Sequence, residues 1–175
     1  MHIHVIIPVY NRLTYTKKII TCLREQTIRN IVKIIVVDDG STDKTGKWLK
    51  KQNDIKTLNG NGKLLWAGAV NLAINYIINK ENQNDWVLLI NNDVEIKNDY
   101  LEILYNVARR SYPAAVGSIV KSKNEELISI GAKILPKKLE VKEIHNDKFL
   151  FKRSDILKNV DVLSGRGVLY PLKSI

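Results

Sequence analysis

The sequence predicts an α/β fold built on one mostly parallel sheet, and three observations support this prediction. Short apolar runs rich in Val and Ile alternate with stretches that carry apolar residues at helical spacing, which is the pattern of successive βαβ units. Most of these apolar runs are followed at once by polar turn residues. The 175 residues are enough for one α/β domain that buries a substantial core.

The first half of the chain alternates regularly between expected strands and helices. Its apolar runs are dense in β-branched residues, as expected of parallel strands that are covered on both faces. Leu13, Ile20 and Leu23 share one helical face, and Asn11 or Thr14 could cap that helix. In chain order the expected elements are a strand at 2–9, a helix at 13–26, a strand at 31–37, a short helix capped by Thr42 or Asp43 and ending near 51, a strand at 54–58, a glycine-rich loop at 59–68 and a helix at 68–79.

The second half continues this alternation and then changes character. Residues 86–90 predict another buried strand, and 100–110 predict a helix because Leu101, Leu104 and Ala108 share a face. Beyond residue 110 the helical spacing disappears, and short strand-like segments with antiparallel pairing take its place, at 114–120, 127–135, 139–144 and 160–170.

Composition excludes several classes of protein. A single cysteine, Cys22, rules out both a disulfide framework and a cysteine-rich zinc module, and its apolar neighbours favour a place in the core. No apolar run approaches the roughly 20 residues that a membrane-spanning helix needs. The first residues are too strand-like for a signal peptide, so a cytoplasmic location is expected.

The chain is strongly basic, with 28 Lys and Arg against 18 Asp and Glu and a formal net charge of +10. Such a balance attracts polyanions, including nucleic acids and anionic lipids. The lysines are spread along the chain, however, which favours solvated helix faces, with contact to a membrane surface as the second interpretation. Nucleic acid is the least favoured partner because no clustered aromatic residues offer a base-stacking platform.

Polar clusters follow three of the expected strands, at 8–12, 38–41 and 91–93. Ligands of parallel α/β sheets bind beyond the carboxyl ends of the strands. The three clusters should therefore lie along one rim of the sheet, and that rim is the predicted binding site. The histidines are not expected to contribute: His2 and His4 share a face at the end of what is expected to be an edge strand, and His145 lies in a polar stretch.

The acidic residues of these clusters allow two interpretations each. Asp93 at a strand end suits a hard divalent cation such as Mg²⁺ or Mn²⁺, although Asn and Asp also favour plain turns. Asp38 and Asp39 are adjacent carboxylates, which repel each other, and a turn requires at most one of them. The second carboxylate is therefore expected to bind a ligand, unless both only shape the turn that leads to Ser41.

The glycines of the 59–68 loop allow backbone to approach a ligand closely, although an ordinary connection is an equal alternative. The loop is not a P-loop, since no Gly-Lys-Ser/Thr follows at the required spacing. It is not a dinucleotide-binding fingerprint either, because that motif follows the first strand directly.

Taken together, these clusters resemble those of the family 2 glycosyltransferases. Residues 6–11 resemble the opening strand and nucleotide-contacting turn of that family, and 36–43 resemble its second strand-end motif. Residues 59–71 resemble the loop and helix that border the nucleotide, and 91–93 fall where the family carries its Asp-x-Asp metal motif.

The resemblance implies a GT-A-type fold with three α/β/α layers, a mostly parallel sheet and short antiparallel strands in the last third. Residues 1–175 would form one nucleotide-sugar-binding domain, with a nucleotide-binding half at 1–110 and the start of an acceptor-side half at 111–175. It further implies that Asp93 binds Mn²⁺ or Mg²⁺ and that Asp39 contacts the nucleobase. The residues expected to contact the nucleotide are Pro8, Val9, Tyr10, Asn11, Arg12, Asp38, Asp39, Asn71, Asn91 and Asn92.

The implied reaction is inverting sugar transfer from a UDP- or dTDP-sugar to a glycan or lipid-linked acceptor, in the synthesis of a bacterial surface polysaccharide. Two departures from the family pattern matter. Asn91 stands where an aspartate is usual, a form that resembles bacterial rhamnosyl- and surface-glycan transferases, and Asn91 or Asn92 is then expected to contact ribose or diphosphate. No carboxylate follows Asp161, where relatives carry the general base, so a truncated chain with weak or absent transfer is expected.

Two other classes of function remain open from the sequence. A nucleotidyltransferase that makes sugar nucleotides also uses a nucleotide-binding α/β sheet, but it needs a glycine-rich loop after the first strand, and 8–12 contains no glycine. A non-catalytic basic module, which binds a membrane or nucleic acid, is the second alternative.

Overall fold

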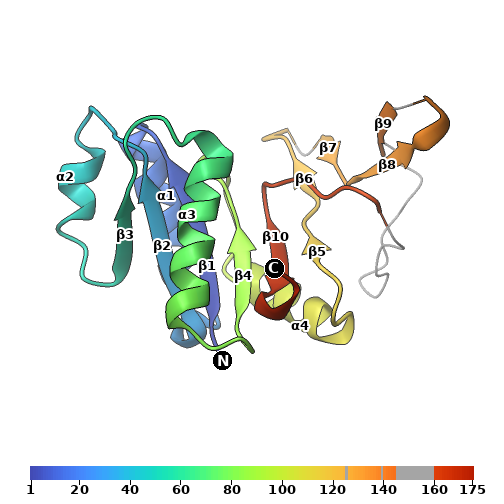
Figure 1. Cartoon of the computed structure of the whole chain (residues 1–175), viewed down its shortest axis with the longest axis horizontal. Helices are drawn as coiled ribbons and strands as arrows, with labels where there is room; N and C mark the ends of the chain where they lie inside the picture. The colour runs from blue at the N-terminus through green and yellow to red at the C-terminus, as the bar shows by residue number, and fades with distance from the viewer. Residues whose placement is uncertain (125, 139, 145–159) are drawn as a thin grey trace.

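The computed structural model describes residues 1–124, 126–138, 140–144 and 160–175. Its centre is a six-stranded sheet of order β3-β2-β1-β4-β10-β5 (Figure 1). Strands β1 to β4 run parallel, whereas β10 runs antiparallel to both β4 and β5. The bounds of these strands are β1 Ile3–Val9, β2 Val32–Asp38, β3 Ile55–Asn59, β4 Trp86–Leu89, β5 Val116–Gly117 and β10 Val168–Pro171.

Helices cover both faces of the sheet, which gives the expected three layers (Figure 1). Alternate residues of β1 face opposite ways: Ile3 and Ile7 pack with α1 and α4, whereas Ile6 packs with α3. All three isoleucines are fully buried, and each such side chain contributes about 1.5–3 kcal/mol relative to exposure. The helices are α1 Leu13–Arg24, α2 Thr45–Leu49, α3 Leu65–Lys80 and α4 Tyr100–Arg110, with short 3₁₀ turns η1 Arg29–Ile31, η2 Pro136–Lys138 and η3 Leu172–Ser174.

Two small antiparallel pairs follow the main sheet in the last third of the chain, as the sequence predicts. Strand β6 (Val120–Lys121) pairs with β7 (Leu127–Ser129), and β8 (Ala132–Leu135) pairs with β9 (Glu140–Glu143). Both pairs lie on the side of the molecule opposite α2 and β3, with β8 and β9 farthest out (Figure 1). Among the described residues, no helix combines the length and the apolar character needed to cross a bilayer.

Several expected elements differ from the structure because long-range contacts decide them. The expected strand at 114–120 is divided, since its first part pairs with β10 and its last part pairs with β7 in another sheet. Residues 164–167 precede β10 instead of lying within a strand. Strand β1 is central and not at an edge, so His2 and His4 lie beside β4. Cys22 is half-buried, and His145 lies outside the described residues.

Helix boundaries are also set by tertiary contacts. Helix α3 begins at Leu65, so Gly68 lies inside the helix and not before it. Neither Asn11 nor Thr14 caps α1, whose first backbone N–H, at Leu13, lies 3.4 Å from a carboxylate oxygen of Asp43. Asp43 also accepts a hydrogen bond from the Thr45 backbone N–H at 2.7 Å, but the N-cap position of α2 is occupied by Lys44, so neither Thr42 nor Asp43 is its cap residue.

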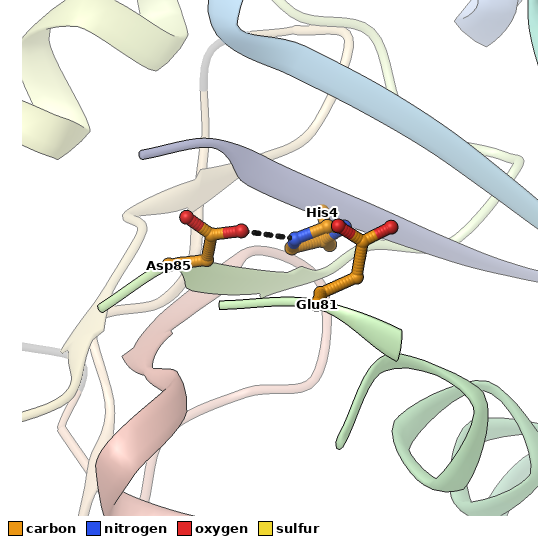
Figure 2. A group of neighbouring side chains, drawn as sticks. All are labelled: His4, Glu81 and Asp85. Atoms are coloured by element: carbon orange, nitrogen blue, oxygen red, sulfur yellow. Dashed lines mark hydrogen bonds and ion pairs between the residues drawn. The ribbon is translucent and has the colours of Figure 1, made fainter. Parts of the chain in front are cut away.

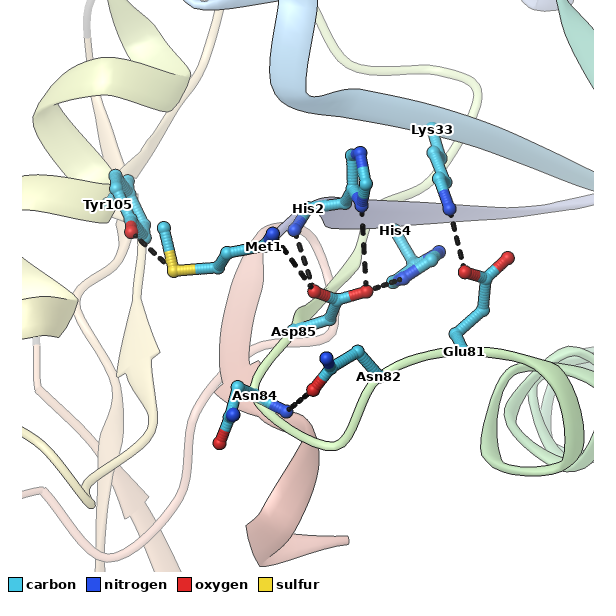
Figure 3. A network of polar contacts seen from close by, with 9 residues as sticks. All are labelled: Met1, His2, His4, Lys33, Glu81, Asn82, Asn84, Asp85 and Tyr105. Carbon is cyan, nitrogen blue, oxygen red and sulfur yellow. Dashed lines mark hydrogen bonds and ion pairs between the residues drawn. The ribbon is translucent and has the colours of Figure 1, made fainter.

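The amino ends of β1 and β4 are joined by the buried carboxylate of Asp85 (Figure 3). Its Oδ1 accepts a hydrogen bond from the His2 backbone N–H at 2.8 Å, and its Oδ2 pairs with His4 Nε2 at 2.9 Å. Because a carboxylate can only accept, the proton of this second bond lies on His4 Nε2. Burial alone would raise the pKa of Asp85, but the hydrogen bonds from His4 and His2 lower it below its ordinary value.

These contacts predict a large loss of stability when the Asp85 carboxylate is removed. Asp85→Ala leaves the buried His4 Nε2–H and the His2 N–H without acceptors, so the free energy of unfolding should fall by about 3 kcal/mol in urea titrations. Asp54→Ala is the control, because its carboxylate is 38% exposed and its ion pairs with Arg24 and Arg29 are open to water, so the loss should be about 1 kcal/mol. Equal losses in the two variants would contradict the anchoring role of Asp85.

The same pair predicts a pH dependence of stability. Burial lowers the pKa of His4 below 6.5, although Asp85 opposes this shift. As pH falls below 6.5, the unfolded chain takes up a proton on His4 that the folded chain does not, so the free energy of unfolding should decrease from pH 6.5 to 5. His4→Gln keeps a donor to Asp85 but does not titrate, and its stability should change less over this interval. Identical pH profiles would contradict this assignment.

Candidate functional site

The carboxyl ends of β1, β2 and β4 lie at one edge of the sheet, because these strands are parallel and adjacent. The Asp39 backbone N–H donates to the Val9 carbonyl at 2.9 Å, which joins the segment after β2 to the end of β1. The Arg12 guanidinium lies 3.4 Å from the Asp93 carboxylate, which joins the segment after β4 to the same place. The structure therefore brings the three predicted clusters together at what we call the carboxyl edge.

Asn11 shapes this edge through hydrogen bonds to the segment that follows β2. Its Oδ1 accepts from the backbone N–H groups of Thr42 at 2.8 Å and Asp43 at 3.1 Å. Its own backbone N–H donates to Ser41 Oγ at 2.7 Å. Asn11 has a positive φ of 58°, a conformation that Asn adopts more readily than most residues. The Asn11 oxygen therefore holds two loops together.

Asp38 and Asp39 are both buried but have separate roles. Asp38 Oδ1 accepts from the Ser41 backbone N–H at 3.0 Å, which is the turn interpretation of this residue. Asp39 accepts three backbone N–H groups: Gly62 at 2.8 Å on Oδ1, and Leu64 at 2.9 Å and Leu65 at 3.1 Å on Oδ2. The second carboxylate thus orders the loop that leads into α3. A carboxylate has about four acceptor positions, so these three bonds leave one position on Oδ1 without a partner in the described part of the chain.

The loop closes so tightly on Asp39 that residue 60 must lack a side chain. A Cβ at Gly60 would lie 2.6 Å from the Leu64 side chain and would also clash with the Asp39 carboxylate. The loop ends at Leu65, which has a left-handed φ of 55° and is 79% exposed. A leucine in this conformation is strained by about 1–2 kcal/mol, and the bonds from Asp39 hold it there.

The three residues after β4 point to three different partners. Asn91 Oδ1 accepts from the Trp66 indole at 3.0 Å. Asn92 is buried and donates from Nδ2 to Thr16 Oγ1 on α1 at 3.2 Å, so its amide supports the fold. Asp93 is 41% exposed and faces Arg12. Asp93 is therefore the carboxylate of this segment that a ligand can reach.

The remaining predicted site residues differ in their exposure to solvent. Val9 is buried in the core, Pro8 is half-buried, and Tyr10 is exposed directly after β1. Asn71 is exposed in the second turn of α3, and its side-chain amide makes no hydrogen bond within the described part of the chain. Trp66 is not among the site residues expected from the sequence. The sequence feature that could have identified it is a tryptophan at the end of a glycine-rich loop, because an indole N–H in such a place needs an acceptor.

A second polar group lies at the opposite edge of the sheet and differs from the carboxyl edge in character. His4, Glu81 and Asp85 have ligand-type atoms within 4.8 Å of one another, the one such group of three among the described residues (Figure 2). Glu81 is already paired with Lys33 at 2.6 Å, and Asp85 with His4 (Figure 3). These pairs account for its carboxylates as anchors of the fold.

Comparison with known proteins identifies the class of this chain. Residues 4–166 match the family model "Glycosyl transferase family 2". The chain therefore belongs to glycosyltransferase family 2, as the motifs predict.

Individual relatives agree with this assignment. Over 107 residues the chain is 30% identical to glycosyltransferase GlyG of Streptococcus pneumoniae, a match that covers 59% of this chain and 34% of GlyG. TarS of S. aureus (residues 1–349, in complex with UDP) superposes with a TM-score of 0.66 at 18% identity, over 98% of this chain and 47% of TarS. The mannosyltransferase PcManGT of Pyrobaculum calidifontis, in complex with GDP-Man and Mn²⁺, gives 0.59 at 22% identity, over 71% and 36%. The chain thus spans less than half of each of these proteins, and the two structures support the GT-A-type fold.

The conformation of Leu65 predicts a stabilising substitution. Leu65→Asn should relieve the left-handed strain without removing buried surface, and it should raise the free energy of unfolding by up to about 1 kcal/mol. Leu65→Val is the opposing variant, because a β-branched side chain fits this conformation worse and should lower stability. Chemical denaturation measures both, and the reverse order would contradict the geometry at the start of α3.

Proposed function

We propose that this chain binds a nucleoside-diphosphate sugar along the carboxyl edge and takes part in transfer of the sugar to a glycan or lipid-linked acceptor, with inversion at the anomeric carbon. The observation that carries the proposal is the convergence of Asn11, Asp39 and Asp93 at this edge. Family membership and the nucleotides present in the TarS and PcManGT structures support it.

Asp93 is proposed to bind Mn²⁺ or Mg²⁺. The donor set fits these ions, which take one or two protein oxygens and complete their shell with water and phosphate oxygens. Asp93 is exposed and lies beside a cation already, the guanidinium of Arg12 at 3.4 Å. When bound, the metal supplies charge stabilisation for the leaving nucleoside diphosphate. Arg12 is then free to bind the diphosphate as a second positive group.

The nucleoside is proposed to lie between the turn after β1 and the loop held by Asp39. Tyr10 is exposed at the start of that turn, and Asp39 retains one acceptor position on Oδ1 for a base N–H. Asn71 offers an exposed amide in the second turn of α3. Asp38, Asn92 and the side chain of Asn11 support these groups through the hydrogen bonds described above.

The proposal assigns no general base within the described residues. Asp161 accepts from the Ile134 backbone N–H at 3.0 Å and pairs with Lys133 at 3.1 Å. These contacts lower the pKa of Asp161 below its ordinary value, which makes it a weaker base. We therefore place donor binding and stabilisation of the leaving group in this chain. We also propose that the chain acts in the cytoplasm, in synthesis of a surface polysaccharide. The net charge of +10 supports contact with an anionic membrane surface.

The proposal predicts metal-dependent nucleotide binding. In calorimetric titrations the chain should bind UDP, GDP or dTDP with micromolar affinity in the presence of Mn²⁺ and more weakly without it. Asp93→Ala should weaken the Mn²⁺-dependent binding at least about tenfold, or about 1.4 kcal/mol, because it removes the exposed carboxylate ligand.

Glu25→Ala is the control for this experiment. It makes the same change of charge at the far end of α1, and it should leave nucleotide binding unchanged. If none of the three nucleotides binds with Mn²⁺, the donor-binding function is wrong. Binding to anionic vesicles or DNA alone would favour a basic interaction module instead.

A further inference from the structure

The orientation of the Asn91 amide is fixed by its contact with Trp66. The indole Nε1–H of Trp66 can only donate, so the Asn91 atom that faces it at 3.0 Å must be Oδ1. Amide orientations are otherwise ambiguous, but here the chemistry of the partner decides. The Nδ2 hydrogens of Asn91 therefore point away from Trp66, and they have no hydrogen-bond partner within the described part of the chain.

Trp66 itself is held from two sides. At its backbone, the preceding residues Leu64 and Leu65 are bound to Asp39 Oδ2. At its ring, it packs against the backbone of Gly165, where an added Cβ would lie only 3.0 Å from Cζ2 and 3.2 Å from Cη2. The indole is thus placed between the segment that precedes β10 and the residues after β4. This placement connects the Asp39 carboxylate to the Asn91 amide through a short series of contacts.

We propose that Trp66 is a positioning residue that turns Asn91 into a hydrogen-bond donor for the anionic oxygens of the bound diphosphate. This inference rests on the proposed function of the same edge. Asn92 uses its Nδ2 on Thr16, so of the two asparagines only Asn91 presents a free N–H pair. Oδ1 of Asn91 accepts the indole N–H and carries no negative charge, so Asp93 is the carboxylate ligand that this segment contributes. A donor aimed at the diphosphate stabilises the charge that develops as the sugar leaves.

Trp66→Phe tests this role because it keeps an aromatic side chain but removes the indole N–H. It also removes Cζ2 and Cη2, which face Gly165, so uridine binding serves as the check on lost packing. Binding of UDP with Mn²⁺ should weaken roughly three- to tenfold, since the Asn91 amide is no longer held. Binding of uridine, which has no phosphate, and of Mn²⁺ alone should stay unchanged. Trp48→Phe is the matched control: it makes the same change on α2 and should not alter any of the three affinities.

Asn91→Asp tests the same inference from the other residue. Aspartate still accepts the Trp66 N–H but offers no donor, and it adds a carboxylate beside Asp93. Affinity for Mn²⁺ alone, measured by electron paramagnetic resonance, should rise severalfold, whereas binding of UDP without metal should weaken. In the unliganded protein the indole N–H resonance of Trp66 should shift in this variant, which checks the contact without any nucleotide.

The outcomes separate this inference from the proposed function. If the wild-type chain binds UDP with Mn²⁺ and both variants bind it equally well, the positioning role of Trp66 is wrong and the donor site stands. If Trp66→Phe loses uridine and UDP affinity in equal measure, Trp66 serves the nucleoside or the fold and not the diphosphate, and the inference is wrong. If the wild-type chain binds no nucleoside diphosphate, both fail, even where the indole resonance responds to Asn91→Asp.

Discussion

The carboxylate of Asp39 is the contact on which the geometry of the carboxyl edge depends. It is buried at the end of β2 and accepts hydrogen bonds from three backbone N–H groups of the loop that leads into α3. Those bonds hold Leu65 in a strained conformation, start α3 at that residue and so deliver Trp66 to Asn91. Through these contacts, one side chain at the end of β2 helps to fix the residues that follow β4, although strand β1 lies between the two strands.

The two edges of the sheet use buried carboxylates in different ways. At the amino ends of β1 and β4, Asp85 accepts hydrogen bonds from His2 and His4. Glu81 pairs with Lys33, so the polar groups there are largely paired. At the carboxyl edge, Asp38 and Asp39 are used by the backbone, but Tyr10, Arg12 and Asp93 stay exposed, and the Arg12–Asp93 pair is open to water. A solvated ion pair of this kind is worth little and is easily exchanged for ligand contacts. This difference distinguishes the end of the sheet whose polar groups are paired from the end where we propose that the nucleotide binds.

The sequence predicts those features that neighbouring residues decide. Apolar β-branched runs identify the four parallel strands, and the spacing of Leu101, Leu104 and Ala108 identifies α4 from its first residue to its last. Parallel order alone brings 8–12, 38–41 and 91–93 together. The start of α3 and the division of 114–120 depend on partners more than 20 residues away, namely Asp39 and β10, which no local pattern reveals. The base contact of Asp39 stays a prediction, because the structure shows the carboxylate holding a loop.

The choice of asparagine over aspartate at position 91 changes the charge and the hydrogen-bond donors of the segment after β4. An aspartate there would also accept the Trp66 N–H, so the fold does not require an amide at this position. What the amide adds is a pair of N–H donors and one less negative charge beside Asp93. Two carboxylates close together would raise metal affinity but would also repel the diphosphate in the absence of metal. In the proposed complex, one carboxylate would serve the cation while Arg12 and the Asn91 amide would face the anion, which spreads the recognition of a diphosphate over three groups of different chemistry.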